Sequence, residues 1–188
     1  MAQHRIPVHP VARLLPWLAL IAVLSLAARV LWLSQWMEVP RIKWELSRMP
    51  PPTALPVPVD GVRASRIAAT FGAPRGRDRQ HQGVDIFAPR GTPVRSATPG
   101  VVLAVREGGL GGRVAWVLGP AGERHYYAHL AGWAPGMEDG RVVRRGELIG
   151  FVGDTGNARG TPPHLHYGIY GGHGAYDPLP LLHAGAPR

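Results

Sequence analysis

The distribution of hydrophobic positions divides the chain into an N-terminal apolar segment and a longer region of short apolar runs. Residues 14–33 are apolar except at three positions, and as a helix they would extend about 30 Å, enough to span a bilayer. From residue 60 onward, short apolar or alternating runs are separated by turns containing Gly and Pro, a pattern typical of β-strands. The runs are Val84–Phe87, Val101–Val105, Val114–Leu118, His125–His129, Leu148–Val152 and Leu165–Tyr170. The pattern predicts a mostly β domain without a long amphipathic helix.

The apolar segment 14–33 has two interpretations. In the first it is an uncleaved transmembrane anchor, in which Arg29 extends its side chain to the membrane interface and tryptophans near both ends occupy the interfacial regions. In the second it is a cleaved signal peptide, with the basic segment 1–13 in front of it and a small-x-small cleavage site at residues 25–27. We favour the anchor. Basic residues flank the segment on both sides, so charge predicts no orientation.

The region between the apolar segment and the strands, residues 34–59, is predicted to be a proline-rich linker. Residues 50–58 contain five prolines and no charge, which excludes a helix there and indicates an extended spacer. We place the folded domain at residues 60–183, a length sufficient for one hydrophobic core. Residues 184–188 are interpreted as a short frayed tail.

Composition and charge narrow the classes of site and partner. The 188 residues include 9 His and no Cys, which excludes disulfides, Cys-based zinc sites, iron–sulfur clusters and cysteine nucleophiles. The net charge is +9, but beyond residue 60 the basic residues are mostly scattered singly, whereas a nucleic-acid binder more often has a basic helix or stripe. We therefore predict no nucleic-acid partner. The charge suits a surface that faces an anionic membrane or cell wall.

Two histidine motifs have the spacing of metal ligands. In His81-Gln-Gly-Val-Asp85 an extended backbone directs positions 81, 83 and 85 to one face, and Gly83 leaves room for an ion. In His164-Leu-His166 both imidazoles face one site, while the leucine between them faces the core. Two His and one Asp supply three protein ligands and leave an open fourth position, as a catalytic zinc site requires. The remaining imidazole of the second motif suits a general base.

A third histidine motif, Tyr127-Ala128-His129-Leu130, lies at the end of a predicted strand. Taken alone, His129 is more simply a core histidine. His125 lies four residues earlier, and we expect it to line the wall of a groove beside His129. The glycine-rich segment 108–112 lacks the Gly-Lys-Ser/Thr of a phosphate loop, so a hairpin turn is the simpler interpretation.

Together, the three histidine motifs resemble those of the lysostaphin/LytM-type zinc metallopeptidases, the M23 peptidases that cut peptide cross-bridges in bacterial cell walls. The resemblance extends from about Arg66 to Pro178 and includes Phe71-Gly72, Gly83–Ile86, Ala88–Val94, Gly100–Val102, Gly146–Gly150 and Gly153–Gly156, in the family's order. The chain departs from the family pattern at Gly168, where Glu is frequent, at Arg113, where Asn is frequent, and in a longer segment 156–163. These departures concern the shape of the groove and substrate preference.

The resemblance implies a role for five side chains. His81, Asp85 and His166 match the zinc ligands of the family, and His129 and His164 match its catalytic histidines. It also implies a compact, mostly antiparallel β-sheet domain with a groove over the metal, here preceded by an N-terminal transmembrane helix.

The function that the resemblance implies is a zinc-dependent peptidoglycan endopeptidase that acts on the peptide stems and cross-bridges of the cell wall. With residues 14–33 as membrane anchor, we expect it in the bacterial cell envelope, anchored in the inner membrane with a periplasmic, extracytoplasmic domain. If the segment is a signal peptide, we expect it to be exported after cleavage. The alternative is a non-catalytic LytM-like module that binds cell wall or activates an amidase. Such modules typically lack one or more ligands, and here all are present.

Overall fold

The computed structural model describes residues 10–76 and 78–186 and divides into two units, Met1–Arg41 and Ile42–Arg188. Residues 1–9 of the predicted basic segment and residues 187–188 of the predicted tail lie outside the described residues. Each unit is compact by its own contacts and is described separately.

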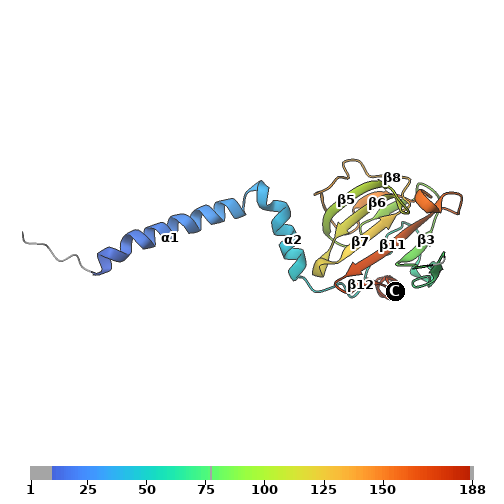
Figure 1. The fold of residues 1–188 in the computed structure, drawn as a ribbon, viewed down its shortest axis with the longest axis horizontal. Coiled ribbons are helices and arrows are strands. Elements are labelled where there is room, and N and C mark those ends of the chain that lie inside the picture. Colours follow the sequence, from blue (N-terminus) through green and yellow to red (C-terminus); the bar gives the residue numbers. More distant parts are fainter. Residues whose placement is uncertain (1–9, 77, 187–188) are drawn as a thin grey trace, which may run out of the picture. The chain divides into compact units, whose positions relative to one another are not determined.

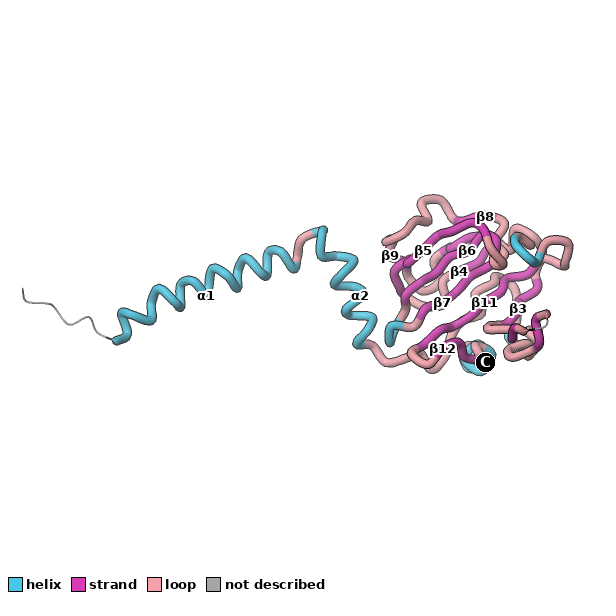
Figure 2. The backbone as a smooth tube through the Cα atoms, viewed as in Figure 1, coloured by secondary structure: helices cyan, strands magenta, loops and turns pink. Residues whose placement is uncertain are grey.

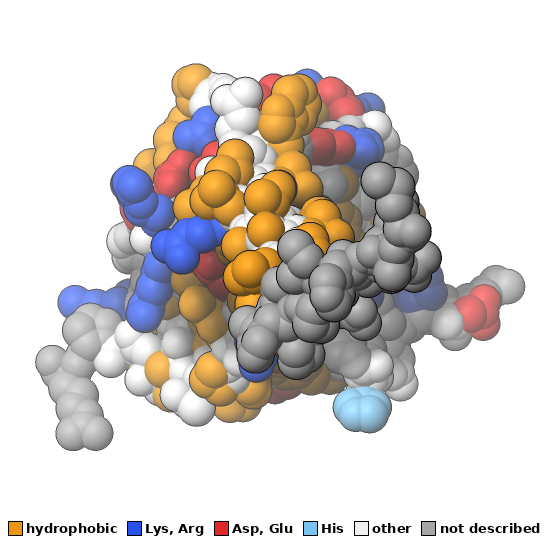
Figure 3. All heavy atoms as spheres, turned by 90° about the vertical axis from the view of Figure 1, so that its left-hand side faces the viewer, with side chains coloured by type: hydrophobic (Ala, Val, Ile, Leu, Met, Phe, Trp, Pro, Cys, Tyr) orange, Lys and Arg blue, Asp and Glu red, His pale blue; other side chains and the backbone are white. Residues whose placement is uncertain are grey.

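The first unit contains one long apolar helix, α1 (Pro10–Trp32). Its stretch Leu14–Trp32 has a mean hydropathy of 2.2 and none of it is buried, so by length and composition it is able to cross a membrane. A signal sequence near an N-terminus has the same properties. Leucine, valine and tryptophan side chains of α1 are exposed, and the exposed hydrophobic side chains of the described residues are orange in Figure 3.

A short helix occupies part of the predicted linker. A 3₁₀ turn, η1 (Gln35–Met37), leads into α2 (Glu38–Arg48), in which only Leu46 is buried. The sequence analysis did not predict α2. Pro40 lies in its first turn, where proline is tolerated, and the helix ends before the prolines that begin at residue 50. The proline segment 50–58 contains no helix, in agreement with the prediction.

The core of the second unit includes residues that precede the predicted domain boundary at residue 60. Leu55 is 1% exposed, and its backbone N–H donates to the carbonyl of Leu181 (2.9 Å). Val59 is 2% exposed and forms an isolated β-bridge with Val94. The end of the predicted linker therefore packs onto the domain, because its two apolar side chains find partners in the core.

A seven-stranded antiparallel sheet forms the main layer of the second unit (Figures 1 and 2). Its strands are β3 (Val84–Phe87), β5 (Gly100–Gly108), β6 (Gly112–Leu118), β7 (Arg124–Ala128), β9 (Val142–Val143), β11 (His164–Gly171) and β12 (Gly174–Tyr176). Their order is β12-β11-β7-β6-β5-β9. The edge of β11 that faces away from β7 pairs with β3 along the first half of β11 and with β12 along the second half.

Smaller elements complete the second unit. A three-stranded sheet has the order β4-β10-β8, and a two-stranded ribbon joins β1 and β2. These elements are β1 (Pro74–Arg75), β2 (Arg79–Gln80), β4 (Pro93–Arg95), β8 (Gly132–Trp133), β10 (Leu148–Phe151), the 3₁₀ turns η2 (Ala64–Arg66), η3 (Pro120–Gly122) and η4 (Gly156–Ala158), and the helix α3 (Leu179–Ala184). Helix α3 was not predicted, and it buries Leu182 at the end of the domain.

The prediction of a mostly β, antiparallel domain is confirmed. Each of the six predicted runs falls largely on a strand of one of the two larger sheets. One hydrophobic core takes side chains from both sheets, for example Val94 and Ile149 from the smaller sheet and Ile86, Tyr127 and Leu165 from the larger one. Because alternate positions on β11 enter this core, the remaining positions face outward and carry the histidines.

Candidate functional site

The pairing of β3 with β11 brings two distant motifs together. In the register of this pair Asp85 lies opposite His166, and Phe87 lies opposite His164. His81 precedes β3, and its backbone N–H donates to the carbonyl of Ala73 (2.9 Å), which holds it beside the sheet. Three side chains separated by up to 85 residues therefore meet at one place.

His81, Asp85 and His166 form a compact cluster of metal-ligating atoms. The distance from Asp85 Oδ1 is 3.0 Å to His81 Nε2 and 3.3 Å to His166 Nδ1, and the two nitrogens are 2.8 Å apart. In the described part of the chain this is the one group of three or more such residues whose ligand atoms all lie within 4.8 Å. Two imidazole nitrogens and one carboxylate oxygen at this spacing fit a divalent zinc ion with an open position.

Neighbouring groups orient the side chains of the cluster. His81 Nδ1–H donates to the carbonyl of Thr70 (2.9 Å), so its Nε2 keeps a lone pair toward the cluster. The Arg75 guanidinium donates to Asp85 Oδ2, so Oδ1 is the carboxylate oxygen that faces the histidines. The sequence analysis missed the roles of Thr70 and Arg75, since no local pattern connects either residue to Asp85.

Gly83 has a different role from the one the sequence suggested. A Cβ atom at this position would lie 2.4 Å from the carbonyl oxygen of Tyr167 and 2.9 Å from His166 Nε2. The glycine therefore makes room for the imidazole ring and for the backbone of β11, and not for an ion. The expectation about Gly83 was wrong in this respect, because the sequence does not reveal how closely β11 approaches.

Two further histidines, His164 and His129, lie beside the cluster. His164 Nδ1–H donates to the carbonyl of Pro162 (2.9 Å), and its Nε2 is 3.9 Å from Asp85 Oδ1. His129 Nδ1–H donates to the carbonyl of Thr155 (2.8 Å), and its ring centroid is 5.0 Å from that of His164. With Nδ1 protonated in both rings, each Nε2 is left as a hydrogen-bond acceptor.

The backbone of His129 explains why this residue faces the site. Along β7 the side chains of His125 and Tyr127 enter the core, whereas Tyr126 and Ala128 line the cavity. Strict alternation would direct His129 into the core as well. Its φ of 64° is left-handed, and this change of backbone direction returns the side chain to the cavity side.

The expectation that His125 lines the groove was wrong. His125 is completely buried, and its Nδ1 lies 2.8 Å from the hydroxyl of Tyr167 on the core side of the sheet. The sequence analysis placed positions 125 and 129 on one face because it assumed a continuous strand. The left-handed residue at 129 breaks that alternation.

Burial sets the charge state of several groups in the site. It lowers the pKa of His129 to about 4, an effect that the hydrogen bond to Thr155 only partly opposes. It also lowers the pKa of His166. For Asp85 burial acts to raise the pKa, but the neighbouring imidazoles of His166 and His81 outweigh this effect, and the pKa falls below the usual range. Near neutral pH the site therefore holds an ionised carboxylate and neutral His129 and His166.

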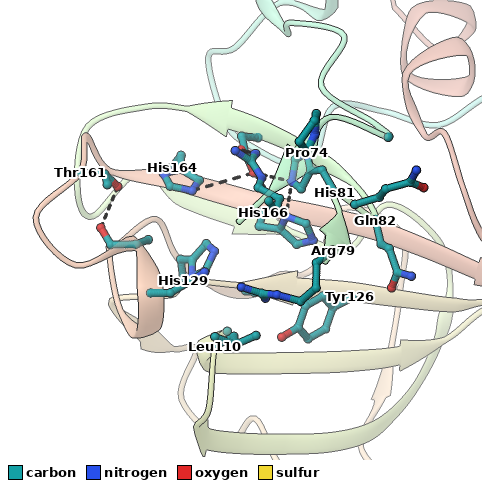
Figure 4. Close-up of a pocket in the computed structure, with 18 of the residues that line it drawn as sticks. Pro74, Arg79, His81, Gln82, Leu110, Tyr126, His129, Thr161, His164 and His166 are labelled. Atoms are coloured by element: carbon teal, nitrogen blue, oxygen red, sulfur yellow. Dashed lines mark hydrogen bonds and ion pairs between the residues drawn. The ribbon is translucent and has the colours of Figure 1, made fainter. Parts of the chain in front are cut away.

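The five side chains open into a cavity of about 1170 Å³ (Figure 4). Its walls include the β1–β2 ribbon with Arg79, the loop residue Leu110, and Tyr126 on β7. The structure thus brings together, in the lining of one cavity, the five residues that the sequence singled out.

Comparison with known proteins identifies the family. The sequence pattern of "Peptidase family M23" matches residues 79–178, more than half of the chain. The chain belongs to peptidase family M23. Two curated relatives of this M23 chain are the L-Ala–D-Glu endopeptidase of Bacillus subtilis (strain 168), 39% identical over 142 residues, and the DD-carboxypeptidase/endopeptidase Mpg of Neisseria meningitidis serogroup B (strain ATCC 13091 / M2091), 46% identical over 90 residues.

These alignments cover 70% and 47% of this M23 chain, but only 43% and 20% of the two relatives. The matched regions of this chain therefore span less than half of either relative's length.

Solved structures show the same fold. The catalytic domain of lysostaphin from Staphylococcus simulans matches 62% of the M23 chain with a TM-score of 0.55 and 30% identity, and 91% of that domain is covered. A zinc-containing peptidase from Vibrio cholerae matches 71% of the chain with a TM-score of 0.58 and 30% identity, and 41% of that structure is covered. The fold and the family assignment agree.

Proposed function

We propose that this M23 chain is a zinc-dependent endopeptidase that cleaves the peptide part of peptidoglycan. The convergence of His81, Asp85 and His166 on one point, with two oriented histidines beside them, carries the proposal. The named activities of the relatives support it, since the aligned B. subtilis protein is an L-Ala–D-Glu endopeptidase and a similar structure is a zinc-containing peptidase.

The atoms that would hold the ion are His81 Nε2, Asp85 Oδ1 and His166 Nδ1. A zinc ion in such a site supplies Lewis acidity, which polarises a scissile carbonyl and lowers the pKa of water. The chain's own contribution is to hold these three atoms together before any ion binds, through the hydrogen bonds of His81 to Thr70 and of Asp85 to Arg75.

We propose different roles for the two remaining histidines. His164 would transfer the proton of the attacking water, and His129 would orient this water. We assign His164 Nε2 as the base that accepts this proton and returns it to the leaving amine. Because His129 is neutral near pH 7 and its Nδ1–H is engaged by Thr155, its Nε2 accepts a hydrogen bond and so orients the water. Donation to the developing oxyanion, the other role considered for His129, would require the imidazole to be protonated.

We further propose that α1 anchors the protein in the inner membrane of a bacterial cell envelope and that the second unit acts on its extracytoplasmic side. The length and hydropathy of Leu14–Trp32 support an anchor, and peptidoglycan as substrate requires an extracytoplasmic location. Cleavage of the same segment as a signal peptide remains the alternative, and N-terminal sequencing of the mature protein distinguishes the two.

The test is hydrolysis of purified sacculi by the full chain in detergent, followed by mass spectrometry of the released peptides. We expect release with zinc, none after chelation, and recovery when zinc is added back. His164→Ala should lower the rate about 100-fold or more, since general acid–base catalysis contributes about 10²–10⁴. His173→Ala, at an exposed loop histidine outside the cavity, is the matched control.

Two results would contradict the proposal. Sacculi that stay intact with a protein that retains no zinc would exclude the metallopeptidase. Wall binding without hydrolysis, unaffected by His164→Ala, would instead favour the non-catalytic module.

A further inference from the structure

We propose that Arg79 determines substrate specificity by binding a free carboxylate on the peptide, next to the bond that is cleaved. The inference rests on the proposed function, because it concerns the substrate of the same groove. It assigns the substrate as an acidic peptide, in preference to a peptide of neutral residues.

Arg79 belongs to the ribbon that forms one wall of the groove. In the register of β1 and β2, Arg79 is the direct partner of Arg75, so both side chains extend from the same face of the ribbon. Both also line the 1170 Å³ cavity that contains the histidines. Two like charges directly opposite each other are unfavourable unless each finds an anion.

The two arginines differ in what neutralises them. The Arg75 guanidinium forms an ion pair with Asp85, which is also the carboxylate of the histidine cluster. For Arg79, by contrast, the structure gives no hydrogen bond or ion pair with any described residue. Asp78, the other acidic residue of the cavity lining, adjoins Arg79 in sequence without forming an ion pair with it.

The direction of the Arg79 side chain places its charge where substrate must pass. In Figure 4 it extends from the ribbon into the cavity above Tyr126, in the direction of His129. Tyr126 is half-buried and its ring packs edge-on against His166, at 5.8 Å between centroids, so this part of the groove adjoins the cluster. A group held by Arg79 would therefore lie close to the reacting bond.

A carboxylate is the ligand that this arrangement fits. A guanidinium presents parallel N–H donors that match the two oxygens of a carboxylate, and such charge-assisted bonds are roughly twice as strong as neutral ones. Because neither acidic residue of the described lining, Asp78 or Asp85, forms an ion pair with Arg79, binding an acidic peptide neutralises a charge that a neutral peptide leaves uncompensated.

The test compares matched substrates and matched variants. The substrates are synthetic stem peptides in which the carboxylate of D-glutamate is free or replaced by a carboxamide, with equivalent pairs at every other stem carboxylate. The enzymes are the full zinc-loaded chain, Arg79→Gln, Arg79→Lys, and the control Arg145→Gln at an exposed arginine outside the cavity. The readout is the ratio of kcat/KM for acid over amide.

We expect the wild-type chain to prefer one acidic peptide about 10- to 100-fold over its amide, the range for a hydrogen bond to a charged group. In Arg79→Gln, kcat/KM should fall by this factor for the acidic peptide and stay unchanged for its amide, so the ratio falls toward one. Arg79→Lys should keep part of the preference, and Arg145→Gln should behave as wild type. A purely structural effect of Arg79 would lower both rates and leave the ratio unchanged.

The outcomes separate the two proposals. Hydrolysis with an acid-to-amide ratio near one for every pair, or equal losses on both peptides in Arg79→Gln, overturns the role of Arg79 while the peptidase function stands. Absence of hydrolysis of sacculi and of all peptides by the wild-type zinc-loaded chain overturns both.

Discussion

At the scale of single residues, the site is ordered by hydrogen bonds to backbone carbonyls. His81, His129 and His164 each donate from Nδ1 to a carbonyl, of Thr70, Thr155 and Pro162 respectively. A carbonyl accepts but never donates, so each bond selects the tautomer whose Nε2 is free. Each Nε2 is therefore free for the proposed metal ligation or proton transfer before substrate arrives. The space that Gly83 leaves for His166 belongs to the same arrangement.

Gly83→Ala tests this packing. Its Cβ would come within 2.4 Å of the Tyr167 carbonyl and 2.9 Å of the His166 ring, so β11 or the imidazole must shift. We expect a loss of about 1–3 kcal/mol in the free energy of unfolding and a reduced zinc content, measured by denaturant unfolding and elemental analysis. Gly172→Ala is the control, because an added Cβ meets nothing within 4 Å there. Equal zinc content in both variants would contradict the role assigned to Gly83.

At the scale of elements, the start of β6 and the loops that contain Leu130 and Thr155 are held together by one threonine. The Thr155 hydroxyl accepts from the backbone N–H of Arg113 (2.9 Å) and donates to the carbonyl of Leu130 (3.0 Å), while its own carbonyl accepts from His129. Close approach is possible because Gly112 and Gly156 face each other. A Cβ on Gly112 would lie 2.3 Å from the Gly156 nitrogen. The orientation of His129 thus depends on how these three segments pack.

Thr155→Val removes the hydroxyl while it keeps the size of the side chain. The N–H of Arg113 and the carbonyl of Leu130 would lose their partner, which costs about 1–3 kcal/mol when such groups are buried. We expect kcat to fall about 10- to 100-fold through displacement of His129, measured by steady-state hydrolysis alongside thermal unfolding. Thr155→Ser retains the hydroxyl and should restore most of the rate. A Val variant as active as the Ser variant would contradict the proposed anchoring.

At the scale of the whole molecule, buried polar groups make stability depend on pH. Burial lowers the pKa of His125 to about 4, and its Nδ1 is bonded to Tyr167. The unfolded chain binds the same proton near pH 6.5, so between pH 6.5 and 4 the unfolded state binds more protons than the folded state. The contribution of His125 to the free energy of unfolding is therefore greatest above pH 6.5 and decreases as the pH falls toward 4.

His125→Gln should remove this contribution to the pH dependence. Between pH 7.5 and pH 5 we expect residues 42–188, freed of metal, to lose about 2 kcal/mol more stability with His125 than with Gln at this position. Urea unfolding at both pH values measures the difference. The exposed His173→Gln is the control, and an identical pH slope for wild type and His125→Gln would contradict the assignment.

Local pattern was sufficient for the strands. Along β11, apolar Leu165 lies between His164 and His166, and alternation alone predicts that the two histidines share a face opposite the core. It failed at His125, because the left-handed residue at position 129 changes the direction of the chain and no local pattern announces it. It also missed α2, whose amphipathic residues lie beside a proline run that indicates an extended spacer.

The sequence by itself determined the β class and the apolar N-terminal helix, since periodicity and residue type are local properties of the chain. The five side chains of the site were indicated by the resemblance of their motifs to those of a known family. Only the tertiary structure decided that His81, Asp85 and His166 meet within hydrogen-bond distance and that Gly83 makes room for an imidazole. It also decided that Arg75 forms an ion pair, whereas Arg79 forms none with any described residue. These facts depend on the register of β3 against β11 and of β1 against β2. The register of a strand pair depends on which side chains of the whole strand face the core. It therefore depends on contacts between residues far apart in sequence, which form only when the sheets pack together.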